Sequence, residues 1–127
     1  MAKDFEWLNE TSQKFLDTGY LIEGETAKER IWDICCAAEN YLSIDGFAEK
    51  LYSYVAAGWV SFSSPVWSNY GRENRGFPVS CYNGTCDDNV PSILYFQSET
   101  GMLSKVGGGT SGYFGNIRPR GSTISEN

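Results

Sequence analysis

The second half of the chain contains an order of segments that strongly restricts the fold. An apolar segment from Phe77 to Tyr82 has the length and composition of a β-strand, and the segment from about Pro91 to Lys105 is predicted to be a helix. A second strand is predicted from Tyr113 to Ile117. Strand, helix and strand in this order indicate a parallel βαβ unit, because parallel strands need a long crossover between them.

The first half of the chain is predicted to be helical. A first helix, which stops at Gly19, is indicated by apolar residues at helical spacing, namely Phe5, Leu8, Phe15 and Leu16. The capping-box pattern from Thr26 to Glu29 opens a second helix, with an apolar stripe of Ile31, Ile34, Cys35, Ala38 and Leu42. A third helix is predicted from Ile44 to Ala57, with Gly58 as its C-terminal stop.

Two other segments are predicted to be irregular. The segment from Trp59 to Gly76 is rich in Ser, Asn and Gly, and its aromatic residues favour an ordered loop. The segment from Asn83 to Asn89 is predicted to be a turn. We therefore expect a helical region over residues 1–58 and a region of strands and loops over residues 59–127.

Composition excludes several classes of function. The net charge of −6 and the pI near 4.5 argue against broad binding to nucleic acid, which requires clustered Lys and Arg. The absence of histidine removes the commonest general base and the commonest metal ligand. The N-terminal residues do not form a secretory signal, so we expect a cytoplasmic protein whose four cysteines are thiols. Their spacing matches no zinc signature, so no metal site is predicted.

Cys81 lies inside the first predicted strand, and the order of the segments places this redox-capable thiol close in the fold to the lysine and glycine run after the predicted helix. The alternative is a small buried apolar residue, which is the usual state of a free cysteine. Cys35 fits that alternative better, because it falls on the apolar stripe of the second helix.

The segment from Lys105 to Gly112 resembles a phosphate-binding surface, because glycines let backbone amides approach an anion and the lysine adds charge. It matches neither a Walker A loop nor a dinucleotide fingerprint, and the alternative is a helix C-cap followed by a tight turn. Ser63, Ser64 and Pro65 form either a second phosphate contact or a simple turn.

The segment Asp87–Asn89 precedes the helix predicted from Pro91. Its side chains are suited either to binding a ribose or base or to capping that helix. The segment Ile117–Ser122 contains Arg118 and Arg120. In the simpler interpretation, this segment is an exposed basic turn.

Taken in order, these motifs resemble the start of the large (α) subunit of ribonucleotide reductase, in a form without an ATP-cone at this end. The resemblance covers nearly the whole chain and rests on Glu25-Thr26, Ser64-Pro65, Ser80-Cys81, Asp87-Asp88-Asn89, Lys105 with Gly107 to Gly109, Ile117-Arg118 and Gly121-Ser122. It implies an α/β fold in which an N-terminal helical region, 1–58, precedes the first strand-helix-strand elements of a ten-stranded α/β barrel, within 59–127. Two strands cannot close a barrel, so the barrel is expected to be incomplete in this chain.

The resemblance also implies roles for individual residues. Cys81 matches the first of two reducing active-site cysteines. The matching substrate contacts are Ser64, Ser80, Gly107 and Gly108. The matching residues of a deoxynucleoside triphosphate effector site and its loop are Asp88, Asn89, Arg118, Gly121, Ser122 and Ile124. Asn89 departs from the usual Ser of that site, and the family's radical cysteine and second reducing cysteine are expected beyond residue 127.

The implied partners are the C-terminal remainder of the subunit, a second large subunit, thioredoxin or glutaredoxin, and a radical source. That source is either a metal-containing small subunit or adenosylcobalamin, and no cofactor is expected to bind this chain itself. The isolated chain is therefore expected to lack reductase activity. Two other hypotheses are a stand-alone nucleotide-binding module and an interaction protein with an unpaired sheet edge.

Overall fold

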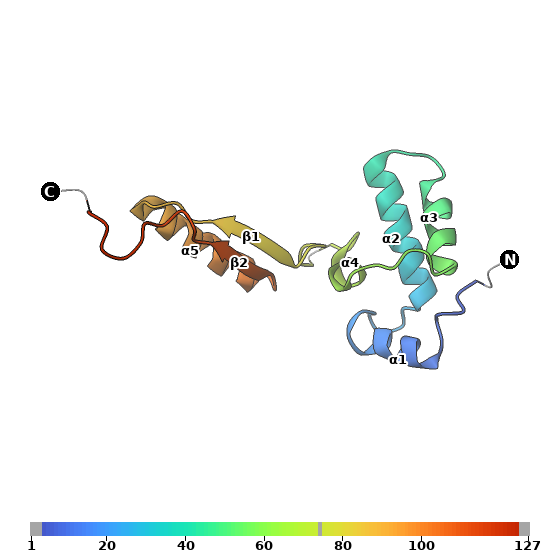
Figure 1. Ribbon diagram of the computed structural model, residues 1–127. Coiled ribbons are helices and arrows are strands. Elements are labelled where there is room, and N and C mark those ends of the chain that lie inside the picture. Colours follow the sequence, from blue (N-terminus) through green and yellow to red (C-terminus); the bar gives the residue numbers. More distant parts are fainter. Residues whose placement is uncertain (1–3, 74, 125–127) are drawn as a thin grey trace. The chain divides into compact units, whose positions relative to one another are not determined.

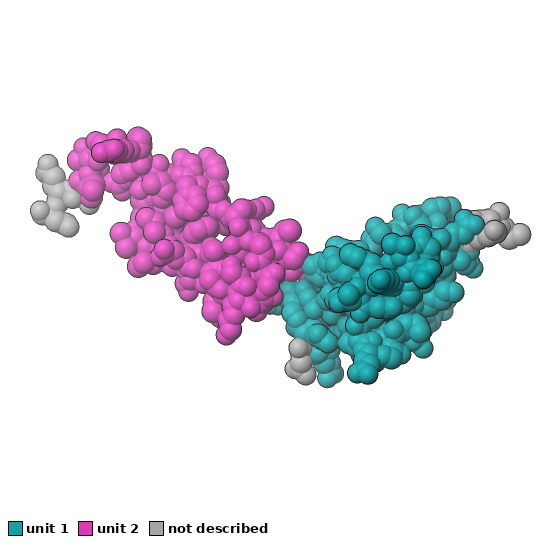
Figure 2. All heavy atoms as spheres, turned by 90° about the horizontal axis from the view of Figure 1, so that it is seen from below, with its two compact units in different colours: residues 1–78 teal, residues 79–127 magenta. Residues whose placement is uncertain are grey.

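The computed structural model describes residues 4–73 and 75–124 and divides the chain into two compact units. Unit 1 comprises residues 1–78 and unit 2 comprises residues 79–127, as coloured in Figure 2. Among the described residues, unit 1 contains helices α1 to α4, and unit 2 contains α5 with strands β1 and β2 (Figure 1). The boundary between the units follows Pro78 rather than Gly58, because Trp67 belongs to the core of unit 1.

The three helices predicted for the first half are present, and the first and third are shorter than predicted. Helix α1 (Glu10–Gly19) begins after Asn9, whose side chain accepts a hydrogen bond from the Ser12 amide at 3.0 Å. Helix α2 (Ala27–Leu42) has the predicted capping box between Thr26 and Glu29. Helix α3 (Phe47–Ala56) starts later than Ile44, because Gly46 adopts a left-handed conformation with φ of +78°.

The core of unit 1 lies between α2, α3 and the segments that pack on them. Its buried apolar residues are Phe5, Leu16, Ala27, Ile31, Ile34, Cys35, Ala48, Val55, Ala56 and Trp67. Leu42, the last residue of the apolar stripe predicted on α2, is not buried and is 46 % exposed. The α2 capping box supports this core by satisfying amides that have no partner within the helix.

Part of the segment predicted to be irregular is helical. Helix α4 (Ser64–Asn69) carries Pro65 in its first turn, where a missing backbone donor costs little. The sequence signal was weak because the helix is short and rich in Ser and Asn. A tertiary contact supports it: buried Arg30 of α2 donates to the backbone oxygens of Trp67 at 2.8 Å, Tyr70 at 2.7 Å and Val66 at 3.1 Å.

Unit 2 has the predicted parallel βαβ topology, but the predicted bounds of both strands, 77–82 and 113–117, were wrong. Strand β1 is Cys81–Thr85, helix α5 is Val90–Lys105, and strand β2 is Gly109–Tyr113. The strands pair in parallel, with Cys81 opposite Gly109 and Thr85 opposite Tyr113. The predicted turn from Asn83 therefore begins as strand, and the predicted strand from Tyr113 begins where β2 ends.

The glycines explain this error. Glycine is depleted in strands, so the glycine-rich segments were interpreted as turns. Here Gly84 and Gly112 lie beneath the ring of Phe96 on α5, and Gly108 lies against the ring of Tyr82. A side chain at any of these positions would collide with an aromatic ring, so close packing of the helix on the sheet requires glycine.

Unit 2 has very little buried side-chain surface of its own. Among its described residues only Cys86 is buried, and α5 has no buried residue. Large apolar side chains on α5, including Leu94, Tyr95 and Met102, are each more than 60 % exposed. An exposed apolar face of this extent is typical of a surface that another element or partner covers.

Candidate functional site

Cys81 is the first residue of β1, and its side chain is exposed. Its Sγ lies 3.9 Å from the hydroxyl oxygen of Ser80. The interpretation of Cys81 as a buried apolar residue is therefore wrong for this structure, in which Cys35 and Cys86 are the buried thiols. An accessible thiol is a prerequisite for redox or nucleophilic chemistry.

The cysteines of α2 are unsuited to the same chemistry. Burial raises the pKa of Cys35 to about 12, with a smaller contribution from Cys36. Burial also raises the pKa of Cys36, with nearby carboxylates adding to the shift. Both therefore remain thiols at neutral pH. Within residues 4–73 and 75–124, no group of three or more His, Cys, Asp or Glu side chains is arranged to hold a metal ion.

A polar pair that the sequence did not predict joins the two strands next to Cys81. Asn83 and Ser111 are opposite each other in the parallel register, and the Ser111 hydroxyl donates to the Asn83 side-chain oxygen. Successive side chains of a strand point to opposite faces, so Asn83 shares a face with Cys81 while Gly84 faces α5. No sequence signal could have found this pair, because only the register brings the two residues together.

A cavity of about 320 Å³ opens beside β1 in unit 2. Its lining comes from β1, α5 and β2 and consists of Cys81, Tyr82, Asn83, Gly84, Phe96, Glu99, Thr100, Leu103, Thr110 and Ser111. This volume lies at the lower end of the range of small-molecule sites. The exposed thiol therefore borders a space with both polar and aromatic walls.

The glycine run after α5 has the conformation of a helix cap leading into a strand. Gly107 has a φ of +87°, and its amide donates to the Ser104 oxygen at 3.0 Å. The amides of Gly108 and Gly109 donate to the oxygens of Leu103 at 2.9 Å and Ser80 at 2.7 Å. All three amides are thus engaged with carbonyls, which favours the C-cap interpretation over an anion-binding cradle.

The structure brings the two predicted parts of the effector site together. The guanidinium Nε of Arg118 donates to a carboxylate oxygen of Asp88 at 2.6 Å, although the residues are far apart in sequence. Asn89 is the N-cap of α5, and its side chain accepts from the Ser92 amide at 2.8 Å. The capping interpretation of Asn89 is therefore correct, and it leaves Asp88 free to contact the loop.

The loop that carries Arg118 is closed by short-range contacts. Gly121 has a φ of +90°, and the backbone amide and hydroxyl of Ser122 both donate to the Pro119 oxygen. Ile124 near its end is 76 % exposed. Asn116, which sequence reasoning missed, donates from its side-chain nitrogen to Asp87 at 3.1 Å.

Of the predicted substrate contacts, Ser64 belongs to unit 1 and Ser80 belongs to unit 2. Ser64 is the first residue of α4, and its hydroxyl lies 3.2 Å from that of Tyr20. Ser80 directly precedes β1 and accepts the Gly109 amide through its backbone oxygen.

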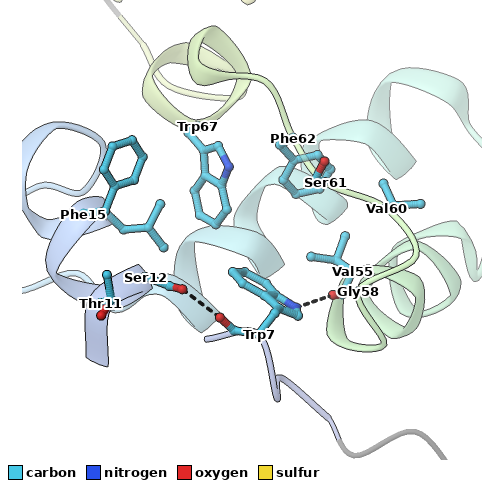
Figure 3. A pocket seen from close by; sticks show the side chains of 11 residues that line it. Trp7, Thr11, Ser12, Phe15, Val55, Gly58, Val60, Ser61, Phe62 and Trp67 are labelled. Atoms are coloured by element: carbon cyan, nitrogen blue, oxygen red, sulfur yellow. Dashed lines mark hydrogen bonds between the residues drawn. The ribbon is translucent and has the colours of Figure 1, made fainter. Parts of the chain in front are cut away.

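Unit 1 contains a larger, mainly apolar pocket of about 530 Å³, with walls that include Trp7, Phe15, Phe62 and Trp67 (Figure 3). The indole nitrogen of Trp7 donates to the Val55 oxygen at 2.8 Å. None of the sequence-predicted site residues lines this pocket.

No helix in the described part of the chain has the length and apolar character needed to cross a membrane.

Comparisons with known proteins indicate the family. No family model matches the chain. Its fold is similar to a solved structure of the Actinobacillus ureae class Id ribonucleotide reductase alpha subunit, with a TM-score of 0.88 and 53% sequence identity. That match covers 100% of this chain and 24% of the larger one.

Curated relatives agree with the structural match. The ribonucleoside-diphosphate reductase large subunit of Invertebrate iridescent virus 6 is 30% identical over 102 residues, which is 80% of this chain and 10% of the relative. The vitamin B12-dependent ribonucleotide reductase of Streptomyces clavuligerus is 35% identical over 65 residues, which is 51% of this chain and 7% of that protein. The chain therefore spans only a small part of the proteins that it matches.

Proposed function

This chain belongs with the large (alpha) subunits of ribonucleotide reductases, corresponding to their N-terminal portion, and we propose that it supplies the first reducing cysteine and the effector loop of such an enzyme. The completed enzyme would reduce ribonucleoside diphosphates to deoxyribonucleotides. The observation that carries the proposal is the exposed Cys81 at the start of β1, in a chain whose sequence is 53% identical to the matched part of a class Id alpha subunit.

The proposed reaction uses Cys81 as one of two thiols. The 2′ carbon of the ribose loses its C–O bond and gains a C–H bond, and the oxygen leaves as water. The two electrons come from two thiols, which lose their hydrogens and become a disulfide. One of these thiols is that of Cys81, and the other belongs to a cysteine of the C-terminal remainder.

The proposed substrate contacts are two serines and two glycines. Ser80 and Ser64 would bind the substrate through their hydroxyls, Ser64 at the diphosphate. Gly107 and Gly108 would lie along the substrate. The backbone amides of both glycines already donate hydrogen bonds to carbonyl oxygens, so we do not assign them to binding the substrate. We propose instead that the absence of side chains lets the substrate approach the backbone closely.

The proposed effector site lies at the start of α5. Asp88 would accept a hydrogen bond from the sugar of a deoxynucleoside triphosphate, with Asn89 beside it. The closing loop would include Arg118, Gly121, Ser122 and Ile124. Asp88 and Arg118 are already in contact, which supports assigning them to one site.

The proposed barrel and partners follow from the same assignment. Strands β1 and β2 would be the first two strands of a ten-stranded α/β barrel that the remainder of the subunit completes. The partners would be that remainder, a second large subunit, thioredoxin or glutaredoxin, and a radical source. The radical source would be a metal-containing small subunit or adenosylcobalamin. The proposed location is the cytoplasm.

A reconstitution experiment tests this function. Mixing the chain with the C-terminal remainder and a radical source is expected to restore reduction of nucleoside diphosphates, whereas the chain alone is inactive. Cys81→Ser should abolish turnover, and the matched variant Cys36→Ser should retain it. Normal turnover by Cys81→Ser with thioredoxin as reductant would refute the role of this thiol.

The second candidate function is a stand-alone nucleotide-binding module. The Asp88–Arg118 contact favours it, because this contact lies entirely within unit 2 and needs no other chain. Calorimetry of the isolated chain with deoxynucleoside triphosphates separates the two. Tight binding by a folded monomer, together with no activity after mixing with the remainder, would favour the module.

A further inference from the structure

Tyr20 lies beside the hydroxyl group that is proposed to bind the diphosphate of the substrate. The hydroxyl oxygens of Tyr20 and Ser64 are 3.2 Å apart, although the two residues are 44 positions apart in the sequence. Ser64 is exposed, whereas Tyr20 is half-buried at the C-terminal end of α1. An exposed hydroxyl group that has one partner keeps further hydrogen-bonding capacity for a ligand.

Three contacts fix the position of Tyr20 independently of Ser64. Its backbone amide donates to the Leu16 oxygen at 3.0 Å, and its ring centroid lies 5.3 Å from that of Phe15. Its backbone oxygen accepts a hydrogen bond from Nη1 of Arg72 at 3.4 Å. The phenol group is therefore held by the backbone and by its ring, and its hydroxyl is brought to Ser64 by these contacts.

Arg72 also connects Tyr20 to the helix that carries Ser64. The same Nη1 atom donates to the Ser68 oxygen of α4 at 3.3 Å, and Nη2 forms an ion pair with Glu25. The side chains of Arg72 and Glu25 are only 13% and 11% exposed. Because this guanidinium is largely buried and paired, it holds the Tyr20 backbone and α4 together.

The later part of α4 is held by a second arginine. Buried Arg30 of α2 donates to the backbone oxygens of Trp67 at 2.8 Å and Tyr70 at 2.7 Å. Ser64 therefore projects from a helix whose backbone is fixed by two guanidinium groups. What remains to be set is the direction in which its hydroxyl proton points.

The direction of the Tyr20–Ser64 hydrogen bond decides what Ser64 can offer to an anion. A serine hydroxyl has one proton to donate and two lone pairs that accept. If Ser64 donates to Tyr20, no hydroxyl proton remains for a phosphate oxygen. If Tyr20 donates to Ser64, the Ser64 proton is free, and the accepted hydrogen bond polarises the hydroxyl group and strengthens its own donation.

We propose that Tyr20 is a positioning residue for substrate binding: its hydroxyl donates to the Ser64 oxygen and thereby directs the Ser64 proton to an oxygen of the substrate diphosphate. This inference rests on the proposed function, in which Ser64 binds the diphosphate. Tyr20 acts through Ser64 and makes no contact of its own with the substrate.

Tyr20→Phe tests this role, because it removes the hydroxyl and keeps the ring against Phe15. In the subunit completed with its C-terminal remainder and a radical source, KM for a ribonucleoside diphosphate is expected to rise about three- to tenfold, while kcat stays nearly unchanged. The matched control Tyr41→Phe removes a hydroxyl from a side chain that is 84% exposed, and it should leave both constants unchanged. An unchanged KM in Tyr20→Phe would overturn the inference.

A double-variant cycle shows whether Tyr20 acts through Ser64. Ser64→Ala is expected to raise KM by itself, and adding Tyr20→Phe to it should cause no further rise. An equal rise of KM from Tyr20→Phe in both backgrounds would mean that Tyr20 acts independently of Ser64, which would overturn the inference.

Equilibrium dialysis with CDP and cytidine needs no radical source and measures binding directly. Tyr20→Phe should weaken the binding of CDP about three- to tenfold and leave that of cytidine unchanged, since cytidine has no diphosphate. Equal losses for both ligands would indicate a general structural effect and overturn the inference.

The same measurement separates this inference from the proposed function. Weaker CDP binding in Ser64→Ala together with normal CDP binding in Tyr20→Phe would overturn the role of Tyr20 and leave that of Ser64 standing. Normal CDP binding in Ser64→Ala would refute the proposed role of Ser64 and, with it, the role of Tyr20.

Discussion

The ring of Phe96 lies against Gly84 so closely that a Cβ atom added to Gly84 would stand 2.7 Å from the Phe96 Cε2 atom. Gly112, the register partner of Gly84, lies beneath the same ring. Helix α5 therefore packs on β1 and β2 through an aromatic ring placed over two glycines. This contact holds the strand that begins with Cys81 beside the strand that begins with Gly109.

Gly84→Ala is expected to destabilise unit 2 by about 1–3 kcal/mol, because the added methyl group has to displace the Phe96 ring. Denaturant unfolding followed by circular dichroism measures the change. The double variant Gly84→Ala with Phe96→Leu should recover part of the loss, since leucine leaves room for the methyl group. The matched control is Gly101→Ala on α5, which meets no atom within 4 Å and should be neutral or stabilising.

Arg30→Met is expected to destabilise unit 1 by about 3 kcal/mol or more, because it leaves three backbone oxygens without their charged donor. The loss should appear as a lower midpoint of thermal unfolding, and α4 should exchange its amides faster. Arg75→Met is the control, since Arg75 is exposed and removing its charge opens no buried contact. Equal stability of the two variants would contradict the structural role of Arg30.

Alkylation should separate the cysteines by accessibility. Iodoacetamide near pH 8 is expected to modify Cys81 first, because its thiol is exposed. Cys35 should react only after unfolding, because it is buried and its pKa is raised to about 12. Mass spectrometry of peptides over time measures the order, and modification of Cys35 before Cys81 in the folded chain would contradict the structure.

Thr26→Ala should remove the capping box of α2 and cost about 1 kcal/mol near neutral pH. The hydrogen bonds from Thr26 lower the pKa of Glu29 below its ordinary value of 4.5. A lowered pKa in the folded chain gives stability that is present above pH 4.5 and is lost as the pH falls through the lowered value. The stability difference between the original chain and Thr26→Ala should therefore shrink in acid, as thermal unfolding across that range can measure.

Local signals were sufficient where the helices carry their own start and stop residues. The capping box at Thr26 and the stop at Gly58 predicted α2 and the end of α3, because each acts within a few residues. The order of strand, helix and strand predicted the parallel pairing of β1 and β2. These features depend on chain-local chemistry and on the length of the crossover.

Contacts between distant residues decided the rest. The strands were misplaced because Gly84, Gly108 and Gly112 are required by aromatic rings that only the folded unit brings near them. Helix α4 depends in the same way on the carbonyl contacts of Arg30. For the candidate site, the resemblance named Asp88 and Arg118, but their ion pair and the Asn83–Ser111 contact depend on tertiary structure.

The near absence of buried side chains in unit 2 has a thermodynamic consequence. With only Cys86 buried among its described residues, unit 2 gains little free energy from excluding water. Heating the chain should therefore melt unit 2 at a lower temperature than unit 1, in two separate calorimetric transitions. A surface that covers α5 would then supply much of the free energy that folds unit 2. The measured affinity of unit 2 for that surface would be reduced by the free-energy cost of ordering unit 2.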